Sequence, residues 1–368
     1  MQRFVPILLI IGFFSSVWFA CAQDLDQSPP GEAKSIEEIR ALALSELKAR
    51  YPETQQALVR RDAHAKAHGC VKAVFAVDAN IPEELRIGTF SQPAQRFKAL
   101  IRFSNGAFEP SADTGLDGRG MAIKIIDVEP HEKSLQRQRP PHDILMINYP
   151  AFFSPNVADY KDFALAGALS GDSEALKRYF MPGYNPLRWR IREAYIAYKI
   201  ASQKITSPLS VQYYSMAPFQ FGTGRAVKYS ARPCASETPS NSVSPEGPDF
   251  LRQALWTTLS ARPACFELLV QERKGDMEIE NTLAEWPESI SPFRRVGKIE
   301  ILSGQADSVD RQKSCESLTF SPWNAPEEQH PLGGINRLRK AVYEGISSYR
   351  NRRNNVMVVD PSVLWDSY

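Results

Sequence analysis

The sequence has little charge imbalance and no long run of one charge sign. Its formal net charge is +2 at neutral pH, and no extended lysine or arginine tract occurs along its 368 residues. A nucleic-acid partner is therefore not expected, because such proteins carry a basic patch or stripe. Internal repeats and a low-complexity tail are also missing. The ordinary apolar and charged fractions are typical of a globular protein with a large core.

Cysteine is sparse, and its spacing excludes several kinds of site. The five cysteines form no CxxC pair, no zinc-finger spacing and no CxxCH cofactor-attachment motif. Four of them lie far apart in the main part of the chain, where three fully paired connectivities are open and free buried thiols are equally acceptable. These four are Cys70, Cys234, Cys265 and Cys315.

Two other familiar patterns are incomplete. The glycine-rich stretch 117–124 lacks the GxxxxGK[ST] signature and opens no helix, so it is not expected to bind phosphate. His64 and His68 have the four-residue spacing of a helical metal pair, but no glutamate follows the first and no third ligand is evident. A zinc site is therefore not expected. The other three histidines lie in predicted loops and carry no signal: His131, His142 and His330.

The one long hydrophobic run lies at the N-terminus. Arg3 precedes the apolar segment 4–20, which ends near small residues, as in a secretory signal peptide cut after Ala22. We therefore expect residues 1–22 to be removed and the protein to be exported to the periplasm, without stable membrane insertion afterwards. A retained membrane anchor is one alternative, although the run is of borderline length. A lipoprotein modified at Cys21 is the other, and Trp18 fits such a signal badly.

Alternating apolar residues predict a series of strands. Val71, Ala73, Phe75 and Val77 share one face of a strand that begins at Cys70. Spaced strands with helices confined to the ends and insertions favour an antiparallel barrel or sandwich in an α+β domain. The further strands are expected over 97–104, 120–128, 210–216, 226–231, 265–272 and 295–302.

Helical patterns flank and interrupt these strands. A polar stretch, 23–34, is expected to be a flexible leader, and the single domain then spans 35–368. A capping box predicts a helix over 35–50, and a proline introduces a second short helix over 53–63. The insertion 170–203 is also rich in helical patterns.

A helical pattern over 334–350 carries the most unusual combination of side chains. It places Arg339, Tyr343, Ile346 and Arg350 on one face. A tyrosine one turn from an arginine is odd for a core, where a hydroxyl and a guanidinium are costly to bury. The arginine would favour the ionised phenol, and a phenolate is a hard anionic ligand for ferric iron. The alternative is a surface amphipathic helix with ordinary arginines.

Six short motifs follow one another between residues 55 and 355. They are Arg61-x-x-His64-Ala-Lys, Arg102-Phe-Ser104, Asp117-x-Arg-Gly-Met-Ala-Ile-Lys124, Asn148-Tyr-Pro-Ala-Phe-Phe153, Phe320-Ser-Pro-Trp-Asn-Ala-Pro326 and Arg339-x-x-x-Tyr343. Haem catalases contain similar motifs in this order, and the chain resembles their short, exported, catalase-related branch. The ordered set is far more specific than any one motif. The resemblance implies an antiparallel eight-stranded β-barrel with helical additions and a buried, non-covalent haem b.

The resemblance also implies a role for each matching residue. Tyr343 would be the proximal iron ligand, and Arg339 would keep it a phenolate. His64 would be the distal acid–base residue that moves a proton between the peroxide oxygens, Ser104 would hydrogen-bond its imidazole, and Asn148 would be the distal amide that orients peroxide. The haem itself would be held by four further residues: Arg61, Arg102 and Arg350 at the propionates, and Tyr160 against the ring.

Two positions depart from the family pattern. Ile147 stands where the first of two asparagines is usual, which puts the role of Asn148 in doubt. Ala63 replaces the usual valine beside the distal histidine, and a smaller side chain could admit bulkier hydroperoxides. The family's long N-terminal arm and flavodoxin-like domain have no counterpart here, which weakens any expectation of the usual tetramer and leaves a homo-oligomer open.

Three functions remain to be separated. The favoured one is an exported haem peroxidase or catalase that acts on hydrogen peroxide or small organic hydroperoxides, with an electron donor that the sequence does not identify. A second keeps the fold and the haem but isomerises fatty-acid hydroperoxides, as allene oxide synthase relatives do. The third is a non-enzymatic haem-binding protein, for which His64 backed by Ser104 would have no use.

Overall fold

The structure is a computed structural model that describes residues 25–128, 141–183, 185–235, 244–356 and 360–368. The predicted signal peptide, residues 1–22, lies outside these residues. Within them, no helix has the length and apolar character that a bilayer crossing requires.

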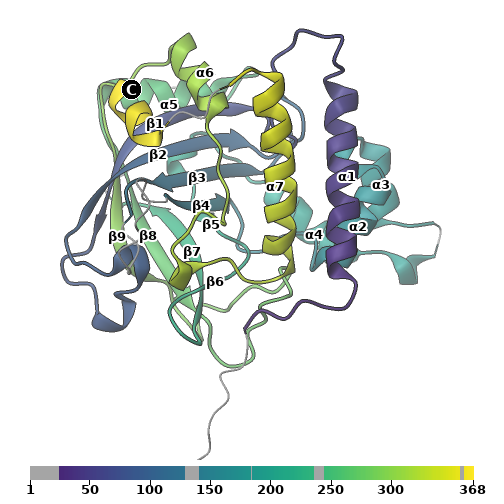
Figure 1. Cartoon of the computed structure of the whole chain (residues 1–368), viewed down its shortest axis with the longest axis horizontal. Helices are drawn as coiled ribbons and strands as arrows, with labels where there is room; N and C mark the ends of the chain where they lie inside the picture. The colour runs from purple at the N-terminus through teal and green to yellow at the C-terminus, as the bar shows by residue number, and fades with distance from the viewer. Residues whose placement is uncertain (1–24, 129–140, 184, 236–243, 357–359) are drawn as a thin grey trace, which may run out of the picture.

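Antiparallel strands close into a barrel at the centre of the molecule (Figure 1). The hydrogen-bonded order runs β5-β4-β3-β2-β1-β9-β8-β7, and pairing of β5 with β7 completes the ring. A short ninth strand, β6 (Phe219–Gln220), adds to the edge of β7. The eight barrel strands are β1 (Ala67–Val77), β2 (Arg96–Asn105), β3 (Arg119–Ile125), β4 (His142–Ile147), β5 (Tyr213–Tyr214), β7 (Ala226–Pro233), β8 (Ala264–Glu272) and β9 (Arg294–Ile301).

The predicted alternation accounts for the barrel interior. Val71, Ala73, Phe75 and Val77 of β1 all lie in one buried apolar cluster with the inward residues of the other strands. Every second residue of β2 from Phe97 to Phe103 joins the same cluster. Closing the sheet into a barrel lets these side chains pack against one another without leaving an open strand edge.

Helices cover one side of the barrel and fill its connections. Within the described residues the α-helices are α1 (Glu32–Arg50), α2 (Val157–Leu165), α3 (Ser173–Phe180), α4 (Ile191–Ala201), α5 (Phe250–Ala261), α6 (Val309–Ser317), α7 (Gly334–Arg353) and α8 (Pro361–Ser367). Short 3₁₀ turns are η1 (Glu83–Leu85), η2 (Gly88–Phe90), η3 (Ala168–Ser170), η4 (Pro186–Arg188), η5 (Pro208–Ser210) and η6 (Glu327–Gln329).

Helices α1 and α7 run side by side along the barrel, with α2 packed against α1 (Figure 1). Apolar residues at four-residue steps form their contact: Leu338, Val342 and Ile346 of α7 share a buried cluster with Ile39 and Leu47 of α1. This spacing repeats once per turn and therefore presents one continuous apolar stripe. The adjacent stripe of α7, which carries Arg339 and Tyr343, faces the barrel side of the molecule.

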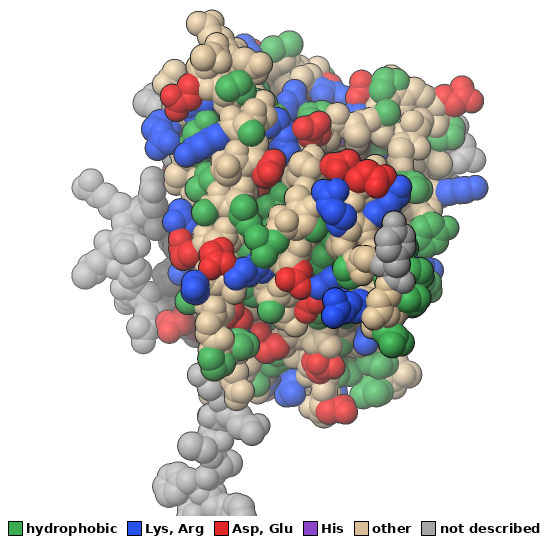
Figure 2. Space-filling view, turned by 90° about the vertical axis from the view of Figure 1, so that its right-hand side faces the viewer, with side chains coloured by type: hydrophobic (Ala, Val, Ile, Leu, Met, Phe, Trp, Pro, Cys, Tyr) green, Lys and Arg blue, Asp and Glu red, His purple; other side chains and the backbone are tan. Residues whose placement is uncertain are grey.

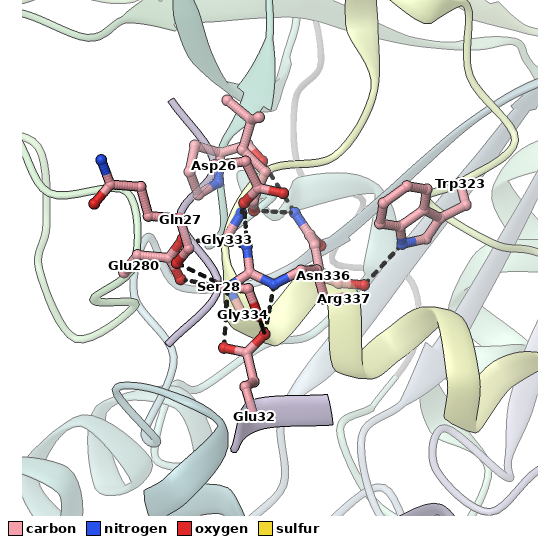
Figure 3. A network of polar contacts seen from close by, with 12 residues as sticks. Asp26, Gln27, Ser28, Glu32, Glu280, Trp323, Gly333, Gly334, Asn336 and Arg337 are labelled. Carbon is pink, nitrogen blue, oxygen red and sulfur yellow. Dashed lines mark hydrogen bonds and ion pairs between the residues drawn. The ribbon is translucent and has the colours of Figure 1, made fainter. Parts of the chain in front are cut away.

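The first turn of α7 is tied to the start of the described chain (Figure 3). Arg337 forms ion pairs with three carboxylates, those of Asp26, Glu32 and Glu280. Asp26 also accepts a hydrogen bond from the backbone N–H of Gly333. Residues 26–32, which the sequence assigns to a flexible leader, are thus bound to α7.

Two disulfides join distant parts of the fold. Cys70 of β1 is bonded to Cys315 of α6, and Cys234 after β7 is bonded to Cys265 of β8. The structure therefore selects one of the three connectivities that the sequence left open. Disulfides persist in oxidising compartments, so both are consistent with a location outside the cytoplasm.

Three local predictions differ from the structure. Helix α1 begins at Glu32, before the predicted capping box, and Gly31 precedes it without a side-chain cap. The second helix predicted over 53–63 is wrong, because this segment is irregular and the backbone groups of Val59 bond to the Asn354 side chain. Strand β4, which includes the fully buried His142, was missed because it is buried on both faces and shows no alternation.

Candidate functional site

A cavity of about 630 Å³ lies between α7 and the barrel. Its barrel wall is the face of β2, β3 and β4 that points away from the apolar interior, and its other wall carries Tyr343 and its neighbours on α7. The segment before β1 and the aromatic residues around α2 and α3 close the remaining sides. The cavity is within the size range of cofactor and ligand sites.

Strand register builds the barrel wall in two rows. Directly paired residues on adjacent antiparallel strands stand side by side, so each row crosses all three strands. Small side chains occupy the middle strand of both rows, which leaves a shallow floor that a flat ligand can approach. The rows are Ser104–Gly120–Ile147 and Arg102–Ala122–Leu145.

His64 stands over the first row in a conformation fixed by the backbone. Its φ is 56°, in the left-handed region, and its carbonyl accepts a hydrogen bond of 2.8 Å from Arg102. Its Nδ1 lies 3.1 Å from Oγ of Ser104. A Cβ at Gly120 would lie 2.6 Å from that Nδ1, so the imidazole can occupy this place only because residue 120 has no side chain.

The environment of His64 keeps its imidazole neutral. Burial, reinforced by the positive charge of Arg102, lowers the pKa of His64 to about 4. At neutral pH the ring therefore has one unprotonated nitrogen. The hydrogen bond with Ser104 engages Nδ1, so Nε2 is the atom left for chemistry in the cavity.

Tyr343 lies on the α7 wall, one turn after Arg339. The Nε atom of Arg339 donates a 3.3 Å hydrogen bond to the Tyr343 phenolic oxygen, and its Nη1 donates to Oδ1 of Asn336 at 3.1 Å. Arg339, Tyr343, Ile346 and Arg350 all line the cavity. The predicted face of the helix is therefore the face turned toward the cavity, rather than a solvated surface.

Three guanidinium groups gather at one end of the cavity with a single strong carboxylate partner. Arg61 forms a 3.1 Å ion pair with Glu316, and Arg102 lies 3.8 Å from the same carboxylate. Arg61 and Arg350 both donate to the backbone carbonyl of Leu318. Burial alone would raise the pKa of Glu316, but the charges of Arg61 and Arg102 hold it below its ordinary value.

Within the part of the chain that the structure describes, nearby carboxylates do not balance the positive charge of this cluster. Burial, with repulsion from Arg61, lowers the pKa of Arg350 to about 9, and burial lowers that of Arg102 well below its ordinary value. The Nε atoms of Arg102 and Arg350 are buried and have no hydrogen-bond partner among the described residues. Burial also raises the pKa of neighbouring Asp62, which disfavours its anionic form. An anionic group in the cavity would supply what the guanidiniums lack.

The residues present fit haem b on these grounds. A porphyrin with two propionates would bring two carboxylates to the unpaired guanidinium atoms, a flat ring to the floor of small residues, and an iron within reach of a phenolic ligand. Phe152 and Tyr160 are nearly parallel, with ring centroids 6.2 Å apart, and both line the cavity. Burial raises the pKa of Tyr160, so its phenol stays protonated and acts as an aromatic wall.

Asn148 does not reach the cavity. Its Oδ1 accepts from the backbone N–H of Arg119 at 2.8 Å, and its Nδ2 donates to the carbonyl of Ile200 at 2.8 Å. The cavity is lined instead by Ile147, the neighbouring residue. The structure thus brings together every predicted site residue except Asn148, whose amide ties the end of β4 to the end of α4.

Sequence reasoning missed two residues that shape the site. Gly120 lies within a recognised motif, but its contact with His64 depends on strand register. Glu316 had no motif and lies far along the chain, next to the disulfide-bonded Cys315. His64 and His68 do not form the helical pair that their spacing allows, because His68 lies within β1.

Comparisons with known proteins point to one group. No protein-family model matches the chain. Catalase-2 of Bacillus subtilis (strain 168) is 25% identical over 289 residues, which make up 72% of this chain and 40% of that protein. A fungal catalase structure aligns with a TM-score of 0.63 and catalase A from Saccharomyces cerevisiae with 0.61, both at 19% identity.

These alignments confirm the fold. They cover 83% and 82% of this chain and 62% of each catalase chain. The chain therefore has the eight-stranded antiparallel barrel of catalases, as predicted, and is distantly homologous to them. It spans less than two thirds of the length of each of these relatives.

Proposed function

We propose that this distant relative of catalases is a haem-dependent enzyme that breaks down hydrogen peroxide or small organic hydroperoxides. One observation carries the proposal: Tyr343 with Arg339, and His64 with Ser104, face one cavity that also holds the unpaired guanidinium atoms of Arg102 and Arg350. Each pair alone has ordinary explanations. Together they match the donor set that a tyrosinate-ligated haem requires.

The cofactor would be held by three kinds of contact. The Tyr343 phenolic oxygen would ligate the iron, and the Arg339 guanidinium would stabilise the negative charge on that oxygen. Arg61, Arg102 and Arg350 would pair with the propionates. When bound, haem supplies the redox chemistry that none of the twenty side chains can supply.

His64 would manage the proton of the substrate. Its neutral imidazole would accept a proton from one peroxide oxygen and deliver it to the other, which would leave as water or an alcohol; the two electrons that cleavage of the O–O bond needs are the redox chemistry that haem would supply. Ser104 would hold the ring in one orientation during both transfers. Arg102 helps to hold the backbone of His64 in its left-handed conformation.

The walls of the cavity favour hydroperoxides that carry a hydrocarbon group. Ile147 lines the wall and Asn148 is turned away, so this side offers a methyl-covered surface to substrate. Ala63 and the phenylalanines near α2 and α3 are also apolar. This surface supports a second candidate, isomerisation of a fatty-acid hydroperoxide, which would consume a lipid hydroperoxide without any reductant.

The decisive experiment begins with the purified protein loaded with haemin. We expect bound haem with the absorption spectrum of a tyrosinate-ligated ferric iron, and expect Tyr343→Phe to lose this spectrum. Tyr349→Phe is the matched control, because Tyr349 lies on the same helix but not in the cavity. A folded protein that ignores haemin would overturn the proposal.

Turnover assays then separate the three functions. Oxygen release from hydrogen peroxide indicates catalase activity, reductant-dependent loss of an organic hydroperoxide indicates peroxidase activity, and reductant-free loss of a lipid hydroperoxide indicates isomerisation. His64→Ala should slow turnover by about 100- to 10,000-fold, the usual contribution of a general acid–base residue. His330→Ala, which changes a histidine outside the cavity, should leave it unaltered. If His64→Ala changes nothing, a haem-binding protein without enzymatic function is the better description.

We further propose that the enzyme works after export as a single domain, with an electron donor outside the cytoplasm. The two disulfides support an oxidising location. N-terminal sequencing of the protein recovered from the periplasm tests this directly. Retention of residues 1–22 in the recovered protein would contradict it.

A further inference from the structure

Large apolar side chains are exposed together around α4 and the turn before it. Leu187 is 95% exposed, Ile191 67%, Tyr198 60% and Tyr195 57%. Monomeric proteins expose scattered apolar residues, but contiguous groups of them mark interaction sites. We call this group the α4 patch; its members are Met181, Leu187, Trp189, Ile191, Tyr195 and Tyr198.

The patch is one face of an amphipathic helix and the turn that leads into it. Ile191, Tyr195 and Tyr198 follow one another at steps of four and three, so they share a side of α4. Ile196 and Ile200 are buried on the other side. The segment between α3 and α4 projects from the right-hand side of the molecule in Figure 1, and Figure 2, which faces that side, shows hydrophobic side chains interspersed with Lys and Arg toward its right-hand edge.

Basic side chains accompany the apolar ones. The stretch 185–204 contains five Lys or Arg residues and one acidic residue, Glu193. Arg190 forms ion pairs with Asp159 and Asp162 of α2. Arg188 and Arg192 are exposed, and no ion pair involves them among the described residues. The patch thus combines Trp, Tyr and aliphatic anchors with unpaired positive charge.

The patch adjoins the cavity. The inner side of α4 contributes Ala197, Ile200 and Ala201 to the cavity wall, and α3 contributes Phe180. Leu116, in the loop after β2, lines the cavity and is 76% exposed, which marks the opening to solvent. One helix therefore presents apolar side chains outward at the patch and inward at the cavity.

We propose that the α4 patch docks onto the surface of an anionic lipid bilayer. Interfacial helices combine an apolar face bearing Trp and aliphatic residues with flanking Lys and Arg, as this segment does. Tyr and Trp prefer the headgroup region, and each basic residue near an anionic surface strengthens binding about fivefold. A second copy of the chain is the other possible occupant, and the test below separates it from a bilayer.

Docking would bring the cavity opening close to the hydrocarbon of the membrane. If the proposed function holds, hydroperoxides that partition into lipid would reach the cavity without crossing water. Membrane binding itself does not depend on that function. The experiment therefore measures lipid binding and haem absorbance on the same samples, so that failure of one is distinguishable from failure of the other.

The test is sedimentation of the exported, haem-loaded protein with vesicles. We expect binding to phosphatidylglycerol-containing vesicles at low salt, and little binding to vesicles of phosphatidylcholine alone. Arg188→Gln with Arg192→Gln should weaken binding about 25-fold, and Leu187→Ser should weaken it further. Ile290→Ser is the matched control, because Ile290 is a 61% exposed aliphatic residue outside the patch.

Three outcomes would overturn the proposal. The first is that the protein does not bind the anionic vesicles. The second is that it binds them but the patch variants bind equally well, because another segment would then be responsible. The third is a dimer, detected by light scattering, that dissociates in the Leu187→Ser variant, because the patch would then be covered by a second copy. All variants change exposed residues, and circular dichroism checks that they fold.

Discussion

Substitution of Gly120 by alanine is the sharpest perturbation of the proposed proton-transfer residue. The added methyl carbon would lie 2.6 Å from Nδ1 of His64, 2.7 Å from its Cε1 and 2.9 Å from Oγ of Ser104, whereas ordinary contacts begin at 3.4 Å. The imidazole must therefore withdraw by about 0.8 Å, the difference between 3.4 and 2.6 Å. A displacement of this order at a reacting group costs about 100-fold in rate.

The assay is peroxide consumption by the haem-loaded variant, read together with its ferric absorption spectrum. We expect Gly120→Ala to bind haem, since Tyr343 and the arginines are untouched, but to turn over peroxide about 100-fold more slowly. Ser104→Ala removes only the hydrogen bond, worth about 1 kcal/mol, and should slow turnover about fivefold. In Gly120→Ala the added methyl group also overpacks the site, which should lower the free energy of unfolding of this variant by about 1–3 kcal/mol.

Gly115→Ala is the matched control. A Cβ there would meet only the carbonyl of Ala112, at an ordinary 3.4 Å, and Gly115 does not line the cavity. Its turnover should equal that of the unaltered protein. Turnover of Gly120→Ala within twofold of this control would refute the reasoning, because the position of the His64 ring would then not matter.

Three further predictions concern stability. Glu316→Gln should destabilise the haem-free protein by about 3–5 kcal/mol, because it removes the carboxylate between two buried guanidiniums. The measurement is urea denaturation, and an unchanged midpoint urea concentration would contradict the charge imbalance described for this cluster. Burial lowers the pKa of His142 to about 3, so between pH 6.5 and 3 the unfolded chain binds a proton that the folded chain does not. His142 should therefore contribute a fall of about 1.4 kcal/mol per pH unit to the free energy of unfolding on acidification through that window, and His142→Gln should lessen the slope by that amount in denaturation at stepped pH; equal slopes would show that this histidine is not buried neutral. Replacing Cys70 and Cys315 together by serine should lower the free energy of unfolding by about 2–4 kcal/mol, and a reductant should then have less effect than on the unaltered protein.

The barrel was predictable where one strand face meets the core and the other does not. Strand β1 alternates in this way, and so does β2, where Arg102 and Ser104 face the cavity. Strand β4 shows no such alternation, because all six of its residues are buried. Local patterns also failed at 53–63, where a proline favours a helix but a tertiary contact with Asn354 takes the backbone hydrogen bonds.

The candidate site divides along similar lines. Residues at helical or strand spacing, such as Arg339 and Tyr343, could be assigned to one face from sequence alone, and the structure places them at the same cavity. Asn148 could not be judged, because a shift of one residue along a strand reverses the direction of a side chain. Glu316 was out of reach, since its contact with Arg61 joins segments 255 residues apart. The chemical roles of all these residues stay predictions until haem binding is measured.

The Arg337 cluster has a consequence for how the N-terminus is trimmed. Asp26 and Glu32 contribute two of the three carboxylates that neutralise this arginine, two turns before Tyr343 on α7. A peptidase that cut downstream of Glu32 would strip both anions from a cation that is only 15% exposed and leave it with Glu280. If the chain is trimmed on export, as we propose, cleavage upstream of Asp26 would spare the anchor of the tyrosine-bearing helix, and each cut beyond Asp26 or Glu32 would weaken it.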